Sequence, residues 1–392
     1  MSGSPPPSSS DALDQFAKVS RLCSLCARMC RHACPTHVAT RSDACSPVGR
    51  ALVVELYRGH KTALTETPVD RLYQCTLCGA CKAWCKPGHE LPRIIELARE
   101  RVIQEHRAPL GIIDLDQTVS KHNNVYSEPH EKRFASLAPV LEQQHSGDNV
   151  IYFVGCTTAY RHPEIATAAI HVLNRLGVTA HILQNEVCCG SPLVRAGYTE
   201  TARTLARQNV EAIATSGIRT VLTTCPGCAR ALKHDYPKLN TPLPGSTTVF
   251  HITEFLAKRR RQLQRLLTSP TTTQGSTSTA VTYHDPCHLG RELGVYNPPR
   301  QLLQLLPGIR LVEFQNTRDH ADCCGAGAVL PKTFPQLAAE IAHRRLDDAA
   351  QTGASLLISS CPNCKQHLTS HQTPSSAMPF LDLMELLARA LK

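Results

Sequence analysis

Cysteine is the residue type whose number and spacing most clearly indicate chemistry in this chain: 19 of the 392 residues are cysteines. Ten of them form two sets with the same order, a single cysteine, an adjacent pair followed by glycine, and a Cys-Pro-x-Cys motif. The first set is Cys156, Cys188, Cys189, Cys225 and Cys228, and the second is Cys287, Cys323, Cys324, Cys361 and Cys364. The gaps within the sets are similar, so the sequence predicts an internal repeat in which five thiolates meet. Five is more than a zinc ion or an ordinary cubane cluster needs.

Eight further cysteines form two runs of four nearer the start of the chain. They are Cys23, Cys26, Cys30 and Cys34 in the first run, and Cys75, Cys78, Cys81 and Cys85 in the second. The second run has the two-two-three spacing of a bacterial ferredoxin motif, with Pro87 displaced by one place, whereas the first has three residues between Cys26 and Cys30. Each run can supply the sulfurs for a four-iron cluster from one tight turn.

The ferredoxin spacing predicts two cubane [4Fe-4S] clusters. In two-cluster ferredoxins the fourth cysteine of each motif serves the other cluster. On that basis one cubane is held by Cys23, Cys26, Cys30 and Cys85, and the other by Cys75, Cys78, Cys81 and Cys34. Structural zinc sites are the alternative; they fit less well, because zinc prefers paired two-cysteine knuckles that close one tetrahedron.

The composition favours metal binding over disulfides. The chain is long, and its first ten residues are rich in Pro and Ser without the basic and apolar regions of a secretory signal, so we expect reduced cysteines. Cys45 lies between the two runs without a partner at ligand spacing. We interpret it as a free thiol with no assigned role.

The formal net charge of +10 does not indicate a nucleic-acid partner. Iron–sulfur clusters with their thiolates are negative and would remove much of this excess. Aromatic residues are only 5% of the chain, and no basic run exceeds residues 258–261, which we interpret as a solvated helix face or a partner contact. No run of eighteen uncharged apolar residues occurs, so we expect no transmembrane helix.

Short apolar runs alternate with helical patterns from residue 150 onward. The predicted strands are 150–154, 178–183, 220–224, 280–283, 310–314 and 355–359, and the helices between them are 163–176, 199–216, 298–306 and 335–352. This alternation predicts an α/β fold class with two repeated α/β units and parallel sheets. Helical patterns at 47–58 and 91–106 predict an α-helical N-terminal domain around the two cubanes.

These patterns divide the chain into segments. We expect a disordered tail at 1–20, a two-cluster ferredoxin domain at 21–110, a linker at 111–148 with a helix around 131–143, a first cysteine-rich domain at 149–267, a flexible join at 268–279 and a second cysteine-rich domain at 280–392. Ligands in parallel sheets gather outside the carboxyl ends of strands. Because all three parts of each five-cysteine set follow strands, the fold can bring them to one place.

A few other side chains lie near the cysteines in sequence. His284 and His288 flank Cys287 and could supply hydrogen-bond donors or a proton near a cluster, or could cap a strand and a helix. Arg195 and Arg291 could bind an anionic substrate in a cleft, or lie on the surface.

The two five-cysteine sets resemble the cysteine-rich CCG domain of the heterodisulfide reductase family, and residues 20–390 resemble the fused D-type polypeptide of that family. The layout is also similar to the iron–sulfur subunits of glycolate oxidase, lactate-utilising oxidases and anaerobic glycerol-3-phosphate dehydrogenase. The resemblance implies that each complete set holds a noncubane four-iron cluster and that the pair of clusters cleaves a disulfide. It therefore implies up to two noncubane clusters besides the two cubanes.

We therefore expect an iron–sulfur oxidoreductase subunit that relays electrons from a flavoprotein dehydrogenase, acting on a 2-hydroxy acid or similar substrate, to a quinone or a disulfide. A disulfide-cleaving catalytic subunit of the heterodisulfide reductase type is the alternative, and a zinc-stabilised interaction module is a third reading from another class. No glycine-rich dinucleotide fingerprint follows a strand, so flavin belongs to another subunit. We expect a cytoplasmic chain, or one bound at the inner face of the membrane through a quinone-reactive partner.

Overall fold

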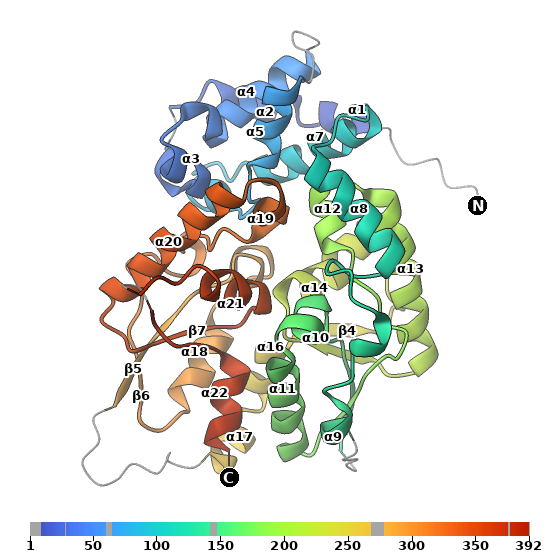
Figure 1. Ribbon diagram of the computed structural model, residues 1–392, viewed down its shortest axis with the longest axis vertical. Coiled ribbons are helices and arrows are strands. Elements are labelled where there is room, and N and C mark those ends of the chain that lie inside the picture. The colour runs from blue at the N-terminus through green and yellow to red at the C-terminus, as the bar shows by residue number, and fades with distance from the viewer. Residues whose placement is uncertain are drawn as a thin grey trace. The chain divides into compact units, whose positions relative to one another are not determined.

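A computed structural model describes residues 9–27, 29–59, 65–141, 147–267, 278–374 and 377–391. The chain forms two compact units (Figure 1). Unit 1 contains Met1–Asp116, Pro192–Thr199 and Gly325–Ile341, and unit 2 contains Gln117–Ser191, Glu200–Cys324 and Ala342–Lys392. Within the described ranges, no helix combines the length and apolar character that crossing a membrane requires.

Unit 1 is helical, as the sequence predicted. Its helices before residue 105 are α1 (Ser9–Asp14), α2 (Ala17–Ser24), α3 (Pro35–Thr40), α4 (Pro47–Arg58), α5 (Glu66–Tyr73), α6 (Ala80–Ala83) and α7 (Leu91–Gln104). Helix α4 begins after Ser46, whose hydroxyl accepts a hydrogen bond from the Gly49 N–H at 3.1 Å and so caps the helix. Helix α7 has Pro92 in its first turn and buries Ile94, Ala98 and Val102 along one face.

The expected disordered tail is wrong for its described part. Residues 9–20 form α1 and most of α2, because Leu13 is buried and α2 packs against α4. Residues 1–8 lie outside the described part of the chain.

The expected linker is also more regular than predicted. Helix α8 (Leu110–His122) buries Ile112, Leu115 and Val119, whose spacing of three and four residues is that of one helical face. The helix expected around 131–143 is present only as the short η3 (His130–Lys132) and α9 (Ala138–Leu141). Most of the flexible join, residues 268–277, lies outside the described residues.

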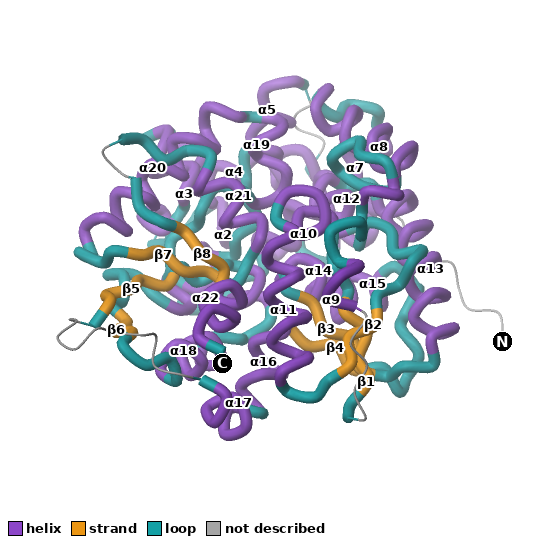
Figure 2. Tube along the Cα trace, turned by 60° about the horizontal axis from the view of Figure 1, so that its bottom comes forward, coloured by secondary structure: helices purple, strands orange, loops and turns teal. Residues whose placement is uncertain are grey.

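Unit 2 contains two four-stranded parallel sheets, which confirms the predicted α/β class (Figure 2). The first has the order β2 (Thr179–His181), β1 (Asn149–Tyr152), β3 (Thr220–Thr223), β4 (Thr248–His251), and the second the order β6 (Ile309–Leu311), β5 (Thr279–Tyr283), β7 (Leu356–Ser359), β8 (Phe380–Asp382). The two orders match strand for strand, so the cysteine repeat is also a repeat of the fold.

The helices of the repeats correspond as well. In the first repeat they are α10 (Cys156–Arg161), α11 (Pro163–Arg175), α12 (Ser191–Ala196), α13 (Thr199–Ser216), α14 (Pro226–Arg230), α15 (Tyr236–Lys238), α16 (Ile252–Lys258) and α17 (Arg260–Leu266). In the second they are η5 (His288–Glu292), α18 (Asn297–Gln304), α19 (Leu330–Thr333), α20 (Pro335–Gln351), α21 (Pro362–Thr369) and α22 (Leu383–Ala390).

The sequence missed the fourth strand of each sheet, β4 and β8. Each is short and runs directly into a helix, α16 or α22, so the apolar residues of strand and helix form one mixed pattern. His251 and Asp382 mark the two boundaries, since each caps its helix in a capping box with Glu254 or Glu385.

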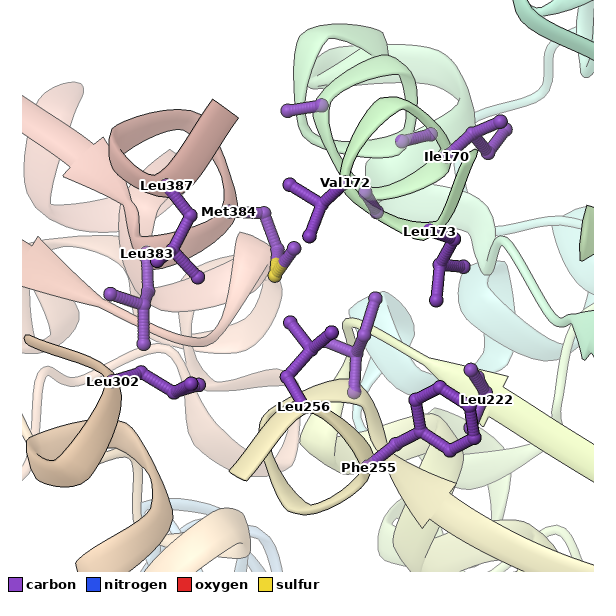
Figure 3. Packing of buried hydrophobic residues seen from close by; sticks show 14 of the residues in the cluster. Ile170, Val172, Leu173, Leu222, Phe255, Leu256, Leu302, Leu383, Met384 and Leu387 are labelled. Atoms are coloured by element: carbon purple, nitrogen blue, oxygen red, sulfur yellow. The ribbon is translucent and has the colours of Figure 1, made fainter. Parts of the chain in front are cut away.

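Helices of the two repeats share one hydrophobic core. Helix α11 packs against α22, and α16 packs against α18, so each pair joins the first repeat to the second. Figure 3 shows Val172 of α11, Met384 of α22 and Leu256 of α16 directed toward one another. All three are fully or almost fully buried. The repeats are therefore packed as one body.

We predict that Leu256→Ala lowers the free energy of unfolding by about 2–5 kcal/mol, because it leaves a cavity where the repeats meet. Thermal or urea unfolding measures the change. The control is Leu110→Ala, since Leu110 is 80% exposed and its loss should change stability by no more than about 0.5 kcal/mol. Equal effects of the two substitutions would contradict the shared core.

Candidate metal centres

Four of the ferredoxin-motif cysteines line one cavity in unit 1. They are Cys34, Cys75, Cys78 and Cys81, the set that the crossed ligand pattern predicted for one cubane. The turn at Gly79, with a φ of 75°, leads into α6, which carries Cys81. Cys34 caps the N-terminus of α3 from the other run. The fold thus brings the fourth cysteine of the first run to the first three of the second.

The other four motif cysteines also interact across the two runs. Burial raises the pKa of the Cys23 thiol to about 12, and the next largest contributions come from Cys85, Cys30 and Cys26. The pKa of Cys30 is raised to about 11 by burial and, in smaller part, by Cys34, Cys85 and Cys26. Cys85 therefore lies with the first run, as the crossed pattern requires, and Cys26 is exposed.

Two buried arginines support the cavity of unit 1. Arg50 donates to Thr36 Oγ1 at 2.6 Å and to Cys34 Sγ at 3.5 Å. Burial alone would lower the pKa of Arg50, but the nearby thiolates of Cys75 and Cys34 raise it. Arg99 donates to the Cys75 carbonyl at 2.6 Å and so holds the loop that carries this cysteine. The guanidinium of Arg50 supplies positive charge where thiolates would bind a cluster.

Cys45 lies outside the lining of this cavity and is fully buried. Its Sγ accepts from Arg71 Nη1 at 3.3 Å and donates to Gln74 Oε1 at 3.2 Å. These contacts give the thiol a structural environment and add no cluster ligand.

The first five-cysteine set converges at the carboxyl ends of its strands in unit 2. Cys156 begins α10 directly after β1, the Cys188-Cys189 loop follows β2, and Cys225 caps α14 after β3, with Cys228 in its first turn. The sulfurs interact in sequence from Cys156 to Cys188, Cys189, Cys228 and Cys225.

The electrostatics of this set favour anionic sulfur at particular positions. Hydrogen bonds from the thiols of Cys188 and Cys228 lower the pKa of Cys189 to about 6. The hydrogen bond with Cys188, together with burial, raises the pKa of Cys156 well above its usual value. Closely spaced buried thiols cannot all ionise without a cation among them, so the set is suited to a metal centre.

Two residues that the sequence did not suggest fix the start of the first set. The Glu186 carboxylate accepts from the Val154 and Gly155 N–H groups at 2.8 and 2.9 Å. It also pairs with Arg133 at 2.5 Å, and the other guanidinium nitrogen of Arg133 lies 3.7 Å from Cys156 Sγ. Glu186 could have been suspected as an acid beside the cysteine pair, but Arg133 lies far away in the expected linker.

The second set converges in the same way. Cys324 Sγ lies 3.4 Å from Cys364 Sγ, Cys323 and Cys361 interact with this pair, and all four are buried. Cys287 is half-buried at the start of η5, after β5. His284, also buried, has a ring nitrogen within 4.8 Å of the sulfurs of Cys324 and Cys364. Burial lowers the pKa of His284, and its neighbour Arg345 lowers it further.

The two sets lie against each other inside unit 2. Thr157, next to Cys156, donates from Oγ1 to Asn363 Oδ1 of the second Cys-Pro-x-Cys motif at 2.7 Å. In the reciprocal position, a Cβ added to Gly227 would lie 3.7 Å from His288 Nδ1. Helix α10 packs against α21, and α14 packs against η5. Each Cys-Pro-x-Cys helix thus contacts the helix that follows the first cysteine of the other set.

Two arginines that the sequence suggested for anion binding have structural partners. Arg195 is buried in unit 1 and pairs with Glu96 at 3.0 Å, so the alternative of a surface position is wrong as well. Arg291 donates to the carbonyls of Asp319 and Ala321. Neither contact leaves these side chains directed at a substrate.

The donor set fits iron–sulfur chemistry. Eighteen cysteines gather in groups of four or five sulfurs, and a cavity lined by one group is supported by a buried guanidinium. Sulfur-only groups of this size are typical of iron–sulfur clusters, which thiolates hold and hydrogen bonds tune.

The model of the "Cysteine-rich domain" family, CCG, matches residues 150–233 and 281–369, one match in each repeat. The D-type polypeptides of heterodisulfide reductases are similar to nearly the whole chain. The one from Methanosarcina barkeri is 36% identical, over 82% of this chain and 78% of its own length, and the one from Methanosarcina acetivorans is 34% identical, over 94% and 93%. The chain belongs to this D-type heterodisulfide reductase family. It is an iron–sulfur oxidoreductase.

This heterodisulfide reductase-like chain is also similar to a longer protein. An "EtfAB:quinone oxidoreductase" from Syntrophomonas wolfei is 24% identical over 82% of this chain, which spans about half (47%) of that relative.

Gly155 provides a test of the first centre. Its φ is 76°, and a Cβ there would lie 2.9 Å from Cys228 Sγ. We predict that Gly155→Ala lowers the iron content by about four atoms per chain, because both the backbone and Cys228 must move. The matched control is Gly245→Ala, where no atom lies within 4 Å of the added methyl group. Full iron content in Gly155→Ala would show that the centre does not need this close approach.

Proposed function

We propose that this chain is the disulfide-reducing component of an electron-transfer complex. Two cubane [4Fe-4S] clusters, held by the ferredoxin-motif cysteines in the crossed pattern, would pass single electrons to two noncubane four-iron centres held by the five-cysteine sets. The observation that carries this proposal is the direct packing of two complete five-cysteine sets against each other.

The reaction that this arrangement serves is R–S–S–R′ + 2 e⁻ + 2 H⁺ → R–SH + R′–SH. It needs two electrons and two sites that can each take one sulfur, and iron–sulfur centres supply electrons one at a time. Thr157 and Asn363 bridge the two sets, and the apolar core shared by α11, α16, α18 and α22 holds the repeats in fixed register. We propose that the substrate disulfide binds where the sets meet.

The electrons would come from another subunit. We find no glycine-rich dinucleotide fingerprint after a strand of this sequence, so a partner would carry the flavin or other two-electron cofactor. A flavoprotein dehydrogenase acting on a 2-hydroxy acid or similar substrate is the partner type that we propose. The similarity to subunits of named reductase complexes supports a multi-subunit assembly.

A relay to a quinone is the second candidate. It is favoured by the similarity to a relative named as a quinone oxidoreductase. In that case a partner at the membrane would meet the quinone, and the five-cysteine centres would pass on electrons without cleaving a disulfide.

We predict about sixteen irons per chain in anaerobically purified protein, four for each of four clusters. Iron and sulfide assays with electron paramagnetic resonance measure this, and an added thiol should change the signals of the five-cysteine centres. Cys323→Ala should remove about four irons, whereas Cys45→Ser, the matched control, should retain all of them.

The outcomes separate the candidates. About eight irons with signals of ferredoxin type alone would contradict the assignment of the five-cysteine sets as redox centres. A full complement whose signals ignore thiols, together with quinone reduction in the presence of the copurified partner, would favour the relay. Turnover of a disulfide with a reduced dye supports the proposed activity.

A further inference from the structure

The two five-cysteine centres differ at one equivalent position. Phe153 and His284 each lie three residues before the first cysteine of their set, and each N–H donates to the middle strand β3 or β7, at Leu222 O or Ile358 O, over 2.8 Å. Both side chains are buried. The first repeat therefore has a hydrocarbon ring where the second repeat has an imidazole.

The hydrogen bonds of His284 determine which ring nitrogen carries the proton. Arg345 Nε lies 3.1 Å from His284 Nδ1, and an arginine nitrogen can only donate. Nδ1 is therefore the acceptor, and a neutral ring must carry its proton on Nε2. Arg345 is itself held by Asp348 and Asp322, at 3.6 and 4.0 Å, and lies over the ring of Phe314.

The proton on Nε2 has no partner among the described side chains and backbone groups. A buried N–H without an acceptor is costly, so an unpaired group of this kind needs a function or a missing partner. The neighbouring acceptors are the sulfurs of Cys324 and Cys364, which lie within 4.8 Å of a ring nitrogen of His284. Sulfur that binds iron is a good acceptor for such a donor.

We propose that His284 donates a hydrogen bond from Nε2 to the sulfur of the second five-cysteine centre and raises its reduction potential. The proposal rests on the function proposed above. A hydrogen bond to cluster sulfur stabilises the more negative, reduced state and so raises the potential. His284 is a positioning residue and not an iron ligand, since a ligating Nε2 would move its proton to Nδ1, against the N–H of Arg345. The first centre has Phe153 in place of this donor.

Redox titration followed by electron paramagnetic resonance tests the proposal. His284→Phe, which copies the residue of the first repeat, should lower the one-electron reduction equilibrium constant of one centre about tenfold, or 59 mV, with the other signals unchanged. His284→Gln keeps an N–H of similar reach and should restore most of the loss. Phe153→Leu, the matched control, should leave this potential as in the unmodified protein.

Unchanged potential in a fully iron-loaded His284→Phe protein would overturn the proposal. If His284→Phe fails to fold, pulsed resonance on unmodified protein labelled with ¹⁵N-histidine decides instead. A weak ¹⁵N coupling to the second centre supports a donor. A coupling of the size of a direct iron–nitrogen bond, or none, contradicts it.

Iron content separates this inference from the proposed function. Protein that lacks iron in the second centre would contradict the proposed function first. Two-bond ¹H–¹⁵N spectra of the same protein, with His284→Phe to assign the signal, then report the tautomer directly. A proton on Nε2 supports the geometry that underlies the inference, and a proton on Nδ1 overturns it.

Discussion

The rest of the structure depends on the burial of many sulfur atoms at the carboxyl ends of parallel strands. A parallel sheet delivers the residues after three neighbouring strands to one edge, which is how Cys156, Cys188 and Cys225 meet although they are far apart in sequence. Buried thiolates repel one another and must be balanced by metal or by cationic donors. The buried Arg133, Arg50 and Arg345 near the cysteines follow from that requirement.

Duplication of the sheet turns one such site into a facing pair. Because α11 packs against α22 and α16 against α18, the two repeats bury a common core and cannot shift independently. The contact between Thr157 and Asn363 lies at the cysteine end of this interface. The apolar core therefore fixes the spacing on which any chemistry that uses both sites depends.

The repeats have kept the sulfur pattern while changing the groups that support it. In the first, Glu186 binds the backbone N–H groups before Cys156 and pairs with Arg133. In the second, Asp285 accepts a two-pronged hydrogen bond from Arg300 at 2.7 and 2.8 Å. Two centres with the same ligands can thus differ in potential and in access to protons, since these properties follow from the surrounding charges and hydrogen bonds.

The sequence by itself determined the repeat, the α/β class and most helices, such as those beginning at Pro47 and Pro163, because spacing and apolar periodicity are local properties. It missed β4 and β8, where a strand passes into a helix without a break, and the helices at 9–14 and 110–122. It identified the cysteines from their motifs, whereas their assignment to individual clusters stays a prediction.

Only the tertiary structure decided which other side chains surround the sulfurs. Arg133 in the expected linker, Arg50 on α4 and Arg345 on α20 reach cysteines that are tens of residues away in sequence. Arg195, which the sequence suggested as an anion site, is instead paired with Glu96. Such pairs depend on how helices pack across long stretches of chain. A motif records the ligands because their spacing is local, but it contains no information about a partner brought in by packing.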